Sequence, residues 1–460
     1  MHMFSKDTYI ARRAKLKETI GSGLLLFLGN DESGMNYADN TYHFRQDSTF
    51  LYFFGLAHAG LSAIIDIDNN REIIFGDELT IDAIVWMGIQ PSLKELSGFA
   101  GIVEVLPSKD IENYLRNAQN KKQQIHYLPT YRAEHQVKLQ SWLGIYPGTE
   151  KPSVSFILGV VNQRNYKTNE EIAEIEKACI VTADMHLTAM QMVRPGIKES
   201  EVAAAVAQVA YANDYQLSFP IIATINGQTL HNHYHGNMIK SGDMLLLDAG
   251  AETGMGYAGD MSSTIPADKK FTSRQKEIYD ISVAAHEAAV AALRPGILFE
   301  DVYDLSVKTI VEGLKDMGFM KGDAMEAVKA GAHAMFMPCG LGHMMGLDVH
   351  DMENLGEVYV GYDGRPKSTQ FGRKSLRLGR KLEPGFVLTI EPGIYFIPEL
   401  IDLWRGENKF TEFINYDKLE TYKDFSGIRN EEDYLITENG ARLLGKKLPL
   451  HTEEVEAIHA

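Results

Sequence analysis

Five ionisable side chains lie within or beside apolar segments in the second half of this 460-residue chain, and this pattern constrains its fold more than any other feature. The segments read MLLLDAG, YAGDMSSTI, GLGHMMGLDVHD, LTIEPGIYF and GIRNEEDYLIT, and the side chains are Asp248, Asp260, His343, Glu391 and Glu431. Each segment is predicted to be a strand or the end of a strand. A carboxylate inside an apolar strand is costly unless a cation neutralises it. Four carboxylates carry about four negative charges, which two divalent cations would cancel.

The donor atoms indicate which cations fit. Oxygen donors with a single nitrogen and no thiolate favour hard ions such as Mn(II), with Co(II) or Fe(II) as alternatives, over a closed structural zinc site. Each carboxylate alone has an ordinary explanation, because Asp248 ends a strand and Asp260 precedes two serines, so either can cap a turn. Five such coincidences in one region are improbable. The set therefore predicts a hydrolase with two metal ions.

Histidine and arginine residues near these segments extend the candidate site. His343 and His350 lie in a glycine-rich segment that we expect to be bent, so that one can ligate a metal while the other reaches the substrate. A lone histidine is more often a core residue, but the acidic residues nearby favour a functional role. Arg429 precedes Glu431 by two residues. It either forms a surface ion pair or orients the carboxylates through its fork of donors.

Residues 254–259, with the sequence GMGYAG, match the GxGxxG pattern of dinucleotide-binding proteins. That pattern requires a helix directly after it. Here the chain continues DMSSTIP, which is rich in β-branched and hydroxyl residues and ends at Pro266. We therefore predict a hairpin at this point and reject nucleotide binding.

Composition limits the partners and the compartment. The chain has 62 Asp and Glu against 45 Lys and Arg, and its net charge of −17 argues against nucleic acid or an anionic membrane as a partner. With two cysteines, Cys179 and Cys339, no disulfide framework is expected and a reducing compartment fits. The first residues lack the apolar segment of a signal peptide, and no apolar run reaches membrane-span length. These observations predict a cytoplasmic protein.

The length favours two domains, one over residues 1–160 and one over 161–460. The first domain alternates amphipathic helix patterns with apolar runs that we predict to be strands: GLLLFLG, FLYFFGL, LSAIIDI, REIIFG and IVEVL. A polar stretch precedes the second domain. Its first helix is expected to begin at Thr168 or Asn169, because acidic residues occupy the following turn.

A weak internal repeat divides the second domain. MVRPGIKESEVAAAVAQV resembles ALRPGILFEDVYDLSVKT, with Arg-Pro-Gly at 194 and again at 294. Each copy would end one helix and begin another, and strands with metal-type residues follow each copy. Two facing halves would place the ligands at their shared interface. The alternative is that helix, Arg-Pro-Gly and helix form a common turn in which glycine ends the first helix.

Nearly the whole chain resembles a known family. The segments LLDAGAE, GYAGD, GLGHMMGLDVHD, EPGFVLTIEPGIY and GIRNEEDYLIT are similar to the signature blocks of the pita-bread metallopeptidases, specifically Xaa-Pro dipeptidases and Xaa-Pro aminopeptidases. TYHFRQDSTFLYFFGL and VWMGIQ resemble the aminopeptidase P N-terminal domain that both groups share. The resemblance implies an α/β (α+β) fold, with an N-terminal α/β domain followed by a duplicated pita-bread domain. It also implies a homodimer and a site for two divalent ions, usually Mn(II), with Co(II), Fe(II) or Zn(II) as alternatives.

The resemblance assigns a role to each metal-type residue. Asp248 and Asp260 would chelate one ion, and Asp260 would bridge to the second. His343 and Glu391 would complete that second ion, and Glu431 would bridge both. The resemblance also assigns roles to three flanking residues. His350 and His231 match histidines that contact the substrate in the family. Arg429 matches the arginine that precedes the bridging glutamate of the family. The run HNHYH leaves His233 and His235 as alternatives to His231.

The sequence departs from the family pattern at three points. The interval between Asp248 and Asp260 is one residue longer than usual, which a bulge near Gly254 would absorb. Asn430 stands where an aliphatic residue is commoner. Cys339 occupies a position usually held by a histidine that lines the substrate pocket, so rate or specificity would be altered.

The reaction implied is metal-assisted hydrolysis of the bond between an N-terminal residue and a following proline in small peptides. Glu391 would accept a proton and pass it towards the departing nitrogen. Arg377 matches an arginine that binds the free carboxylate of a dipeptide in prolidases, although a solvated basic loop with Lys374, Arg380 and Lys381 is the alternative. We therefore favour an Xaa-Pro dipeptidase over an Xaa-Pro aminopeptidase that acts on longer peptides. A catalytically weak peptide-binding relative is a third alternative, but such relatives normally lose ligands, and all five are present here. The residue preference at the first position of the substrate stays open.

Overall fold

The structure is a computed structural model that describes residues 3–458. The chain forms two compact units. The first contains the residues up to 164 together with 352–359, and the second contains residues 165–351 and 360–460. Across residues 3–458, no helix combines the length and the apolar character needed to cross a membrane.

The first unit is built on a five-stranded sheet with the order β6-β5-β4-β1-β7. β4 is antiparallel to β1 and β5, whereas β6 pairs in parallel with β5 and β7 in parallel with β1. The strands are β1 (Leu24–Leu28), β4 (Ser62–Asp66), β5 (Arg71–Phe75), β6 (Glu104–Leu106) and β7 (Ile125–His126), and a separate hairpin is formed by β2 (Gly34–Tyr37) and β3 (Asn40–Thr41).

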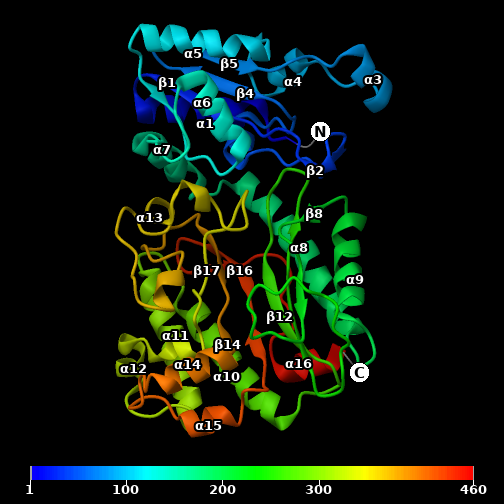
Figure 1. Ribbon diagram of the computed structural model, residues 1–460, viewed down its shortest axis with the longest axis vertical. Coiled ribbons are helices and arrows are strands. Elements are labelled where there is room, and N and C mark those ends of the chain that lie inside the picture. Colours follow the sequence, from blue (N-terminus) through cyan, green and yellow to red (C-terminus); the bar gives the residue numbers. More distant parts are fainter. Residues whose placement is uncertain (1–2, 459–460) are drawn as a thin grey trace. The chain divides into compact units, whose positions relative to one another are not determined.

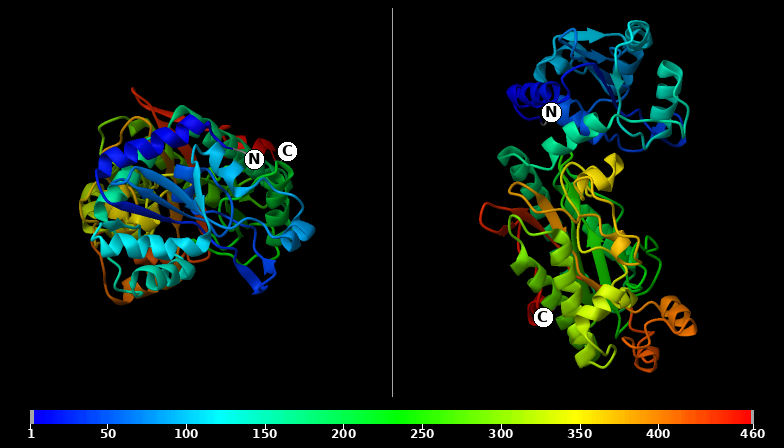
Figure 2. Two further views of the ribbon diagram at one scale, coloured as in Figure 1. Left: turned by 90° about the horizontal axis from the view of Figure 1, so that it is seen from above. Right: turned by 90° about the vertical axis from the view of Figure 1, so that its left-hand side faces the viewer.

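Helices cover both faces of this sheet, which explains why its strands read as continuous apolar runs (Figure 2). Leu24 and Leu26 of β1 belong to a core that includes Leu115 and Leu139. Phe27 points to the other face and lies 5.0 Å, ring to ring, from Phe156. The helices are α1 (Lys6–Ile20), α2 (Ser48–Phe54), α3 (Ile81–Met87), α4 (Leu93–Phe99), α5 (Ile111–Asn120), α6 (Ala133–Leu143) and α7 (Val154–Arg164).

One predicted strand of this unit is wrong, because FLYFFGL lies mostly in the helix α2 and not in a strand. Asp47 caps that helix by accepting a hydrogen bond from the Phe50 N–H at 2.9 Å, and Gly55 ends it in the left-handed conformation. An apolar run alone does not distinguish a buried strand from a buried helix. The flanking aspartate and glycine are the local signals that favour the helix.

The second unit contains two helix pairs joined by the Arg-Pro-Gly turns. The first long helix begins at Asn169 with Thr168 as its N-cap, in agreement with the sequence prediction. The pairs are α8 (Asn169–Met192) with α9 (Glu199–Ala212), and α10 (Ser273–Ala292) with α11 (Phe299–Asp316). The shorter helices of this unit are α12 (Ala324–Ala330), α14 (Pro398–Gly406), α15 (Tyr416–Glu420) and α16 (Thr452–Ile458). Another short helix, α13 (Glu357–Val360), belongs mostly to the first unit, which includes residues 352–359.

The two Arg-Pro-Gly turns make the same contacts. Gly196 N–H donates to the Ile239 carbonyl at 2.9 Å, and Gly296 N–H donates to the Leu382 carbonyl at 2.8 Å. Both glycines have a positive φ, of 93° and 84°. In each copy the turn arginine donates to the carbonyl of the residue two places before it, at 3.2 Å. The sequence similarity therefore reflects a shared local structure.

Each helix pair is followed by strands, and the two sets of strands meet in the middle of the unit (Figure 1). Ser262 and Glu431 form the bridge between the sets, with the Glu431 N–H donating to the Ser262 carbonyl at 2.9 Å. In the first half β10 lies between β9 and β12, and in the second half β16 lies between β13 and β17. The strands are β8 (Gln216–Leu217), β9 (Ile222–Thr224), β10 (Met244–Ala249), β11 (Ala251–Glu252), β12 (Met261–Pro266), β13 (Val387–Ile390), β14 (Gly393–Tyr395), β15 (Gly427–Arg429), β16 (Glu432–Ile436) and β17 (Ala441–Leu443).

The segment that matches GxGxxG forms a turn between strands. Thr253 N–H donates to the Tyr257 carbonyl at 2.9 Å, and β12 follows directly after Asp260. The helix that a dinucleotide-binding motif requires directly after this segment is therefore replaced by a strand, and the next helix, α10, begins only at Ser273. The predicted hairpin is confirmed.

Two glycines let main-chain segments touch beside the candidate ligands. A Cβ atom at Gly250 would collide with the Gly259 carbonyl, and a Cβ atom at Gly342 would collide with the Thr389 carbonyl. Gly250 lies two residues after Asp248, and Gly342 directly precedes His343. In both halves, therefore, the ligand-bearing chain lies against its neighbour with no side chain between them.

Candidate metal centre

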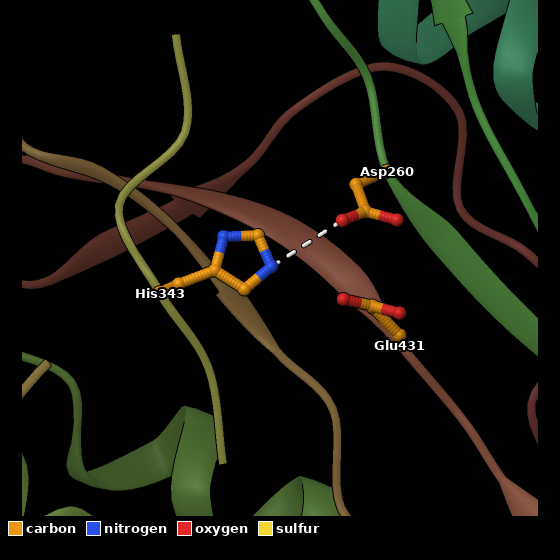
Figure 3. A group of neighbouring side chains, drawn as sticks. All are labelled: Asp260, His343 and Glu431. Atoms are coloured by element: carbon orange, nitrogen blue, oxygen red, sulfur yellow. Dashed lines mark ion pairs between the residues drawn. The ribbon is translucent and has the colours of Figure 1, made fainter. Parts of the chain in front are cut away.

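Three ligand-type side chains converge where the two halves of the second unit meet (Figure 3). Asp260 directly precedes β12, His343 lies in a loop, and Glu431 lies between β15 and β16. One ligand atom of each lies within 4.8 Å of those of the other two. The His343 Nε2 atom is 3.3 Å from Asp260 Oδ2. This spacing suits a shared cation.

The carboxylates of the site are buried and incompletely satisfied. Asp248 and Asp260 are 8% and 5% exposed, and Oδ1 of each has no hydrogen-bond partner within residues 3–458. Burial, reinforced by the neighbouring carboxylates, raises the pKa of Asp260 and Glu431 well above their ordinary values. Such a site holds protons unless cations replace them. Unpartnered buried oxygens beside an imidazole therefore fit divalent ions.

Glu391 differs from the other acids in its access to solvent. Its side chain is 20% exposed, and its Oε1 atom is 3.9 Å from His343 Nε2. Its main-chain N–H donates to the Leu341 carbonyl at 2.7 Å, which fixes it to the loop that carries His343. Burial raises the pKa of Glu391, while His343 and Arg429 oppose the rise. A partly open carboxylate with a raised pKa is suited to exchanging a proton.

Arg429 is buried beside the acids, which excludes the surface ion pair considered from the sequence. It is 4% exposed, and its guanidinium donates to Asp248 Oδ2 at 2.5 Å, to Ser262 Oγ at 2.9 Å and to the Tyr395 hydroxyl at 3.0 Å. The bonds to Ser262 and Tyr395 hold the guanidinium in place, and the bond to Asp248 orients that carboxylate. They also leave its other oxygen available for a cation.

Three residues behind the ligands were not identified from the sequence. Ser262 donates to Glu431 Oε2 at 2.7 Å, and Tyr395 accepts a hydrogen bond from Arg429. Asp433 accepts hydrogen bonds from the Asp260 N–H and from Cys179 Sγ, both at 3.1 Å, and burial raises its pKa to about 7. The position of Asp433 two residues after Glu431 was the one available signal, because alternate residues of a strand share a face.

The candidate substrate histidines differ in their surroundings. His350 is half-buried and its ring centroid lies 4.3 Å from that of His343. His231 is more exposed than His350, and partial desolvation of its ring, followed by the charge of Arg429, lowers its pKa. His235 Nε2 instead faces the Ile221 carbonyl at 3.0 Å. His231 thus interacts electrostatically with charged residues of the site. Of the three histidines in HNHYH, we therefore retain His231 as the candidate substrate contact.

An apolar patch lies next to the acids. It consists of buried side chains with partly buried neighbours: Ile222, Leu246, Tyr395, Leu230, Cys339 and Ile397. Burial raises the pKa of the Cys339 thiol to about 12, and the charge of Glu391 also raises it. The thiol is therefore neutral and extends the apolar surface.

Arg377 is half-buried, and its charge lowers the pKa of both Glu391 and His231. Its basic neighbour Arg380 is buried and pairs with Glu383 at 3.2 Å. The loop is therefore not uniformly solvated. Arg377 lies close enough to the acids to interact with them electrostatically.

A buried cluster of ligand-type side chains at the junction of two matching α/β halves is typical of a metalloenzyme. Metallopeptidase family M24 matches residues 173–438, and the aminopeptidase P N-terminal domain matches residues 9–126. The chain belongs to metallopeptidase family M24, with the aminopeptidase P type of N-terminal domain.

Relatives cover the full length of the chain. It is 30% identical to Xaa-Pro dipeptidase of Homo sapiens over 98% of this chain and 92% of that protein. It is also 30% identical to Xaa-Pro aminopeptidase of Escherichia coli (strain K12), over 100% of this chain and 98% of that protein. Its structure is similar to that of Zn-substituted E. coli aminopeptidase P in complex with product, with a TM-score of 0.80, 28% identity and coverage of 100% and 99%.

Proposed function

We propose that the protein hydrolyses the peptide bond between an N-terminal residue and proline, and that it favours Xaa-Pro dipeptides. The observation that carries this proposal is the buried cluster of Asp260, His343 and Glu431 beside an apolar patch, in a chain whose relatives include an Xaa-Pro dipeptidase. The apolar patch suits a proline ring. The acids suit the free amine of the substrate.

Two divalent cations are proposed to bind at this centre, held by Asp248, Asp260, His343, Glu391 and Glu431. The unpartnered oxygens of Asp248 and Asp260 support this assignment. Oxygen donors with one imidazole favour Mn(II), and the Zn-substituted relative supports zinc as an alternative. When bound, divalent cations at such a site lower the pKa of a water molecule and polarise a carbonyl.

The remaining residues would position the substrate and transfer protons. Glu391 accepts a proton and passes it towards the proline nitrogen. His350 and His231 donate hydrogen bonds to the substrate carbonyl as it becomes tetrahedral. Arg429 holds Asp248 in place through its bond to that carboxylate.

Metal analysis together with a Gly-Pro hydrolysis assay tests the proposal. Purified protein should contain one to two divalent ions per chain, lose them in chelator and lose activity in parallel. Re-addition of Mn(II) should restore turnover. Full activity in chelator, from protein that contains no metal, would refute the metal-dependent reaction.

A second candidate is an aminopeptidase that acts on longer peptides, and Arg377 separates it from the dipeptidase. A guanidinium facing the carboxylate that follows proline gains ~1.5–3 kcal/mol from charge-assisted bonds, which a longer peptide lacks. Wild type should favour Ala-Pro over Ala-Pro-Ala, and Arg377→Ala should lose this preference by roughly 10- to 100-fold, mainly through KM. Lys374→Ala, in the same loop, is the control. Better cleavage of the tripeptide with a silent Arg377→Ala would identify the aminopeptidase.

A further inference from the structure

Lys167 is a buried cation outside the candidate centre. It directly precedes Thr168, the N-cap of α8, and is 6% exposed. Its Nζ atom donates to Asp351 Oδ2 at 2.9 Å, and both side chains are 1% exposed. Removing both charges from water is costly, so a buried ion pair is weak evidence for a role in stability. The partner Asp351 directly follows His350 in sequence, so the pair is placed to act on the loop that carries this histidine.

The loop of residues 344–351 closes on itself next to this ion pair. The Asp351 N–H donates to the Met344 carbonyl at 2.8 Å, and the Asp348 N–H faces Asp351 Oδ1 at 3.4 Å. His343 and His350 directly precede the two residues that close the loop. This closure therefore brings their rings together, with centroids 4.3 Å apart.

Lys167 joins this loop to the strands behind it. Its main-chain N–H donates to the Gly385 carbonyl at 2.9 Å, just before β13, while its side chain binds Asp351. A Cβ atom at Gly346 would lie 2.7 Å from Asp351 Oδ2 and 3.0 Å from Lys167 Cε. The ion pair thus packs directly against the main chain of the loop at Gly346.

We infer that Lys167 is a positioning residue that holds the loop of residues 344–351, and through it the imidazole of His350, in the arrangement required for turnover. This inference rests on the proposed function of His350 as a substrate contact. Lys167 itself touches neither the candidate ligands nor the substrate in this assignment. Its effect on the rate is transmitted through Asp351.

A double-mutant cycle on the full-length, metal-loaded enzyme tests the inference. Lys167→Met keeps the length of the side chain but removes its charge, and should lower kcat on Ala-Pro about tenfold, with little change in metal content. In the His350→Ala background the same substitution should cause less than about a twofold further loss, because effects transmitted through one residue are not additive. Lys177→Met is the matched control, because Lys177 lies on α8 but is exposed and pairs with Glu174.

A spectroscopic measurement makes the test independent of activity. In protein with isotope-labelled histidine, Lys167→Met should shift or broaden the ring resonance of His350, which His350→Ala identifies by its disappearance, and Lys177→Met should leave it unchanged. If Lys167→Met does not fold, Asp351→Asn removes the charge attraction with nearly the same shape and enters the same cycle.

The outcomes separate the two proposals. An unaltered His350 resonance, an equal loss of kcat in both backgrounds, or a loss explained by missing metal would overturn the role of Lys167 and leave the peptidase untouched. A wild type that does not hydrolyse Ala-Pro would refute the proposed function. In that case the resonance alone decides whether Lys167 positions His350.

Discussion

Both halves of the second unit consist of a helix pair followed by strands, but they differ in how they position the candidate metal ligands. In the first half, Asp248 lies on β10 and Asp260 directly precedes β12, and the pairing of Asp248 with Ser262 and of Ala249 with Met261 fixes their separation. In the second half, His343 comes from a loop and only the two glutamates flank strands. The first half therefore supplies two acids that lie within or beside one pair of hydrogen-bonded strands, whereas the second half supplies its donors from separate segments.

The second half also contains more irregular chain. In this unit, residues 336–351 and 360–386 form no strand and include three of the four candidate substrate contacts, Cys339, His350 and Arg377. The fourth, His231, lies in the shorter irregular stretch between β9 and β10. In the proposed assignment, the strands of both halves would position the cations, while the irregular chain, which lies mainly in the second half, would contact the substrate.

The largest expected effect tests whether the halves act as one site. Asp260→Asn removes a candidate ligand from the first half and Glu431→Gln removes one from the second, and both substitutions are nearly isosteric. Each should lower turnover by roughly 10³-fold or more, because several kcal/mol of transition-state stabilisation depends on the complete centre. The double variant should be no worse than either single variant, since residues that act as a unit are not additive. Steady-state kinetics with metal analysis measures this.

An additive loss in the double variant would contradict a shared centre and would assign an independent ion to each half. The surface variant Glu326→Gln, on α12, is the control for the chemistry of the substitution. It should leave turnover and metal content unchanged.

A smaller effect compares a histidine that occurs at the same position in both copies. His186 and His286 each precede the Arg-Pro-Gly arginine by eight residues. His186 Nδ1 faces Ser263 Oγ at 2.7 Å and Nε2 faces the Ala249 carbonyl at 3.2 Å, whereas neither ring nitrogen of His286 has a hydrogen-bond partner within residues 3–458. His186→Leu should lower the free energy of unfolding by about 1–3 kcal/mol, and His286→Leu by less.

Burial also lowers the pKa of both histidines to about 4, below the unfolded value near 6.5. The unfolded state therefore binds the proton first as the pH falls. Each histidine contributes stability that is complete above pH ~6.5 and is lost towards pH ~4, by about 2 kcal/mol at pH 5. Denaturant unfolding of metal-free protein at pH 7 and pH 5 measures this loss. Each leucine variant should lose less stability on acidification than wild type, and an unchanged loss would contradict the buried, neutral state.

The smallest expected effect concerns the irregular chain of the second half. Cys339 has a neutral thiol, which is a weaker hydrogen-bond donor than an imidazole. Cys339→His should raise kcat/KM on Xaa-Pro substrates by up to ~1 kcal/mol, or roughly fivefold, with metal content unchanged. Cys339→Ser, of similar size, is the control. A loss of activity in the histidine variant would indicate that the pocket has been rebuilt around the smaller residue.

The acidic candidate ligands could be predicted because a carboxylate within or beside an apolar strand is a local and unusual signal. The prediction of a strand for GLGHMMGLDVHD is wrong, because His343 lies in a loop, but its grouping with Asp260 and Glu431 is confirmed.

Ser262 and Asp433 could not be predicted, because their roles depend on which strands pair: Ser262 becomes important through its bridge to Glu431. Hydroxyl and acidic residues in strands are otherwise too common to single out. Lys167 could not be predicted for the same reason, because its partner Asp351 lies 184 residues away in the sequence.

The fold was predicted best where sequence signals agree with each other. The capped start of α8 and the two Arg-Pro-Gly turns combine several local cues, and the structure confirms the helix start and gives both turns the same contacts. The strand prediction for FLYFFGL fails because its apolar pattern fits a buried strand and a buried helix equally well, and only the caps Asp47 and Gly55 favour the helix.

The contact of main chain with main chain at Gly250 and Gly342 bears on how such a protein can change over evolution. Because no side chain separates the touching segments, main-chain contact alone sets how closely they approach. Substitutions of apolar residues elsewhere add no atom to either contact. A single added methyl group at either glycine would instead push two segments apart. We therefore expect very little tolerance to substitution at two positions that have no side chain at all.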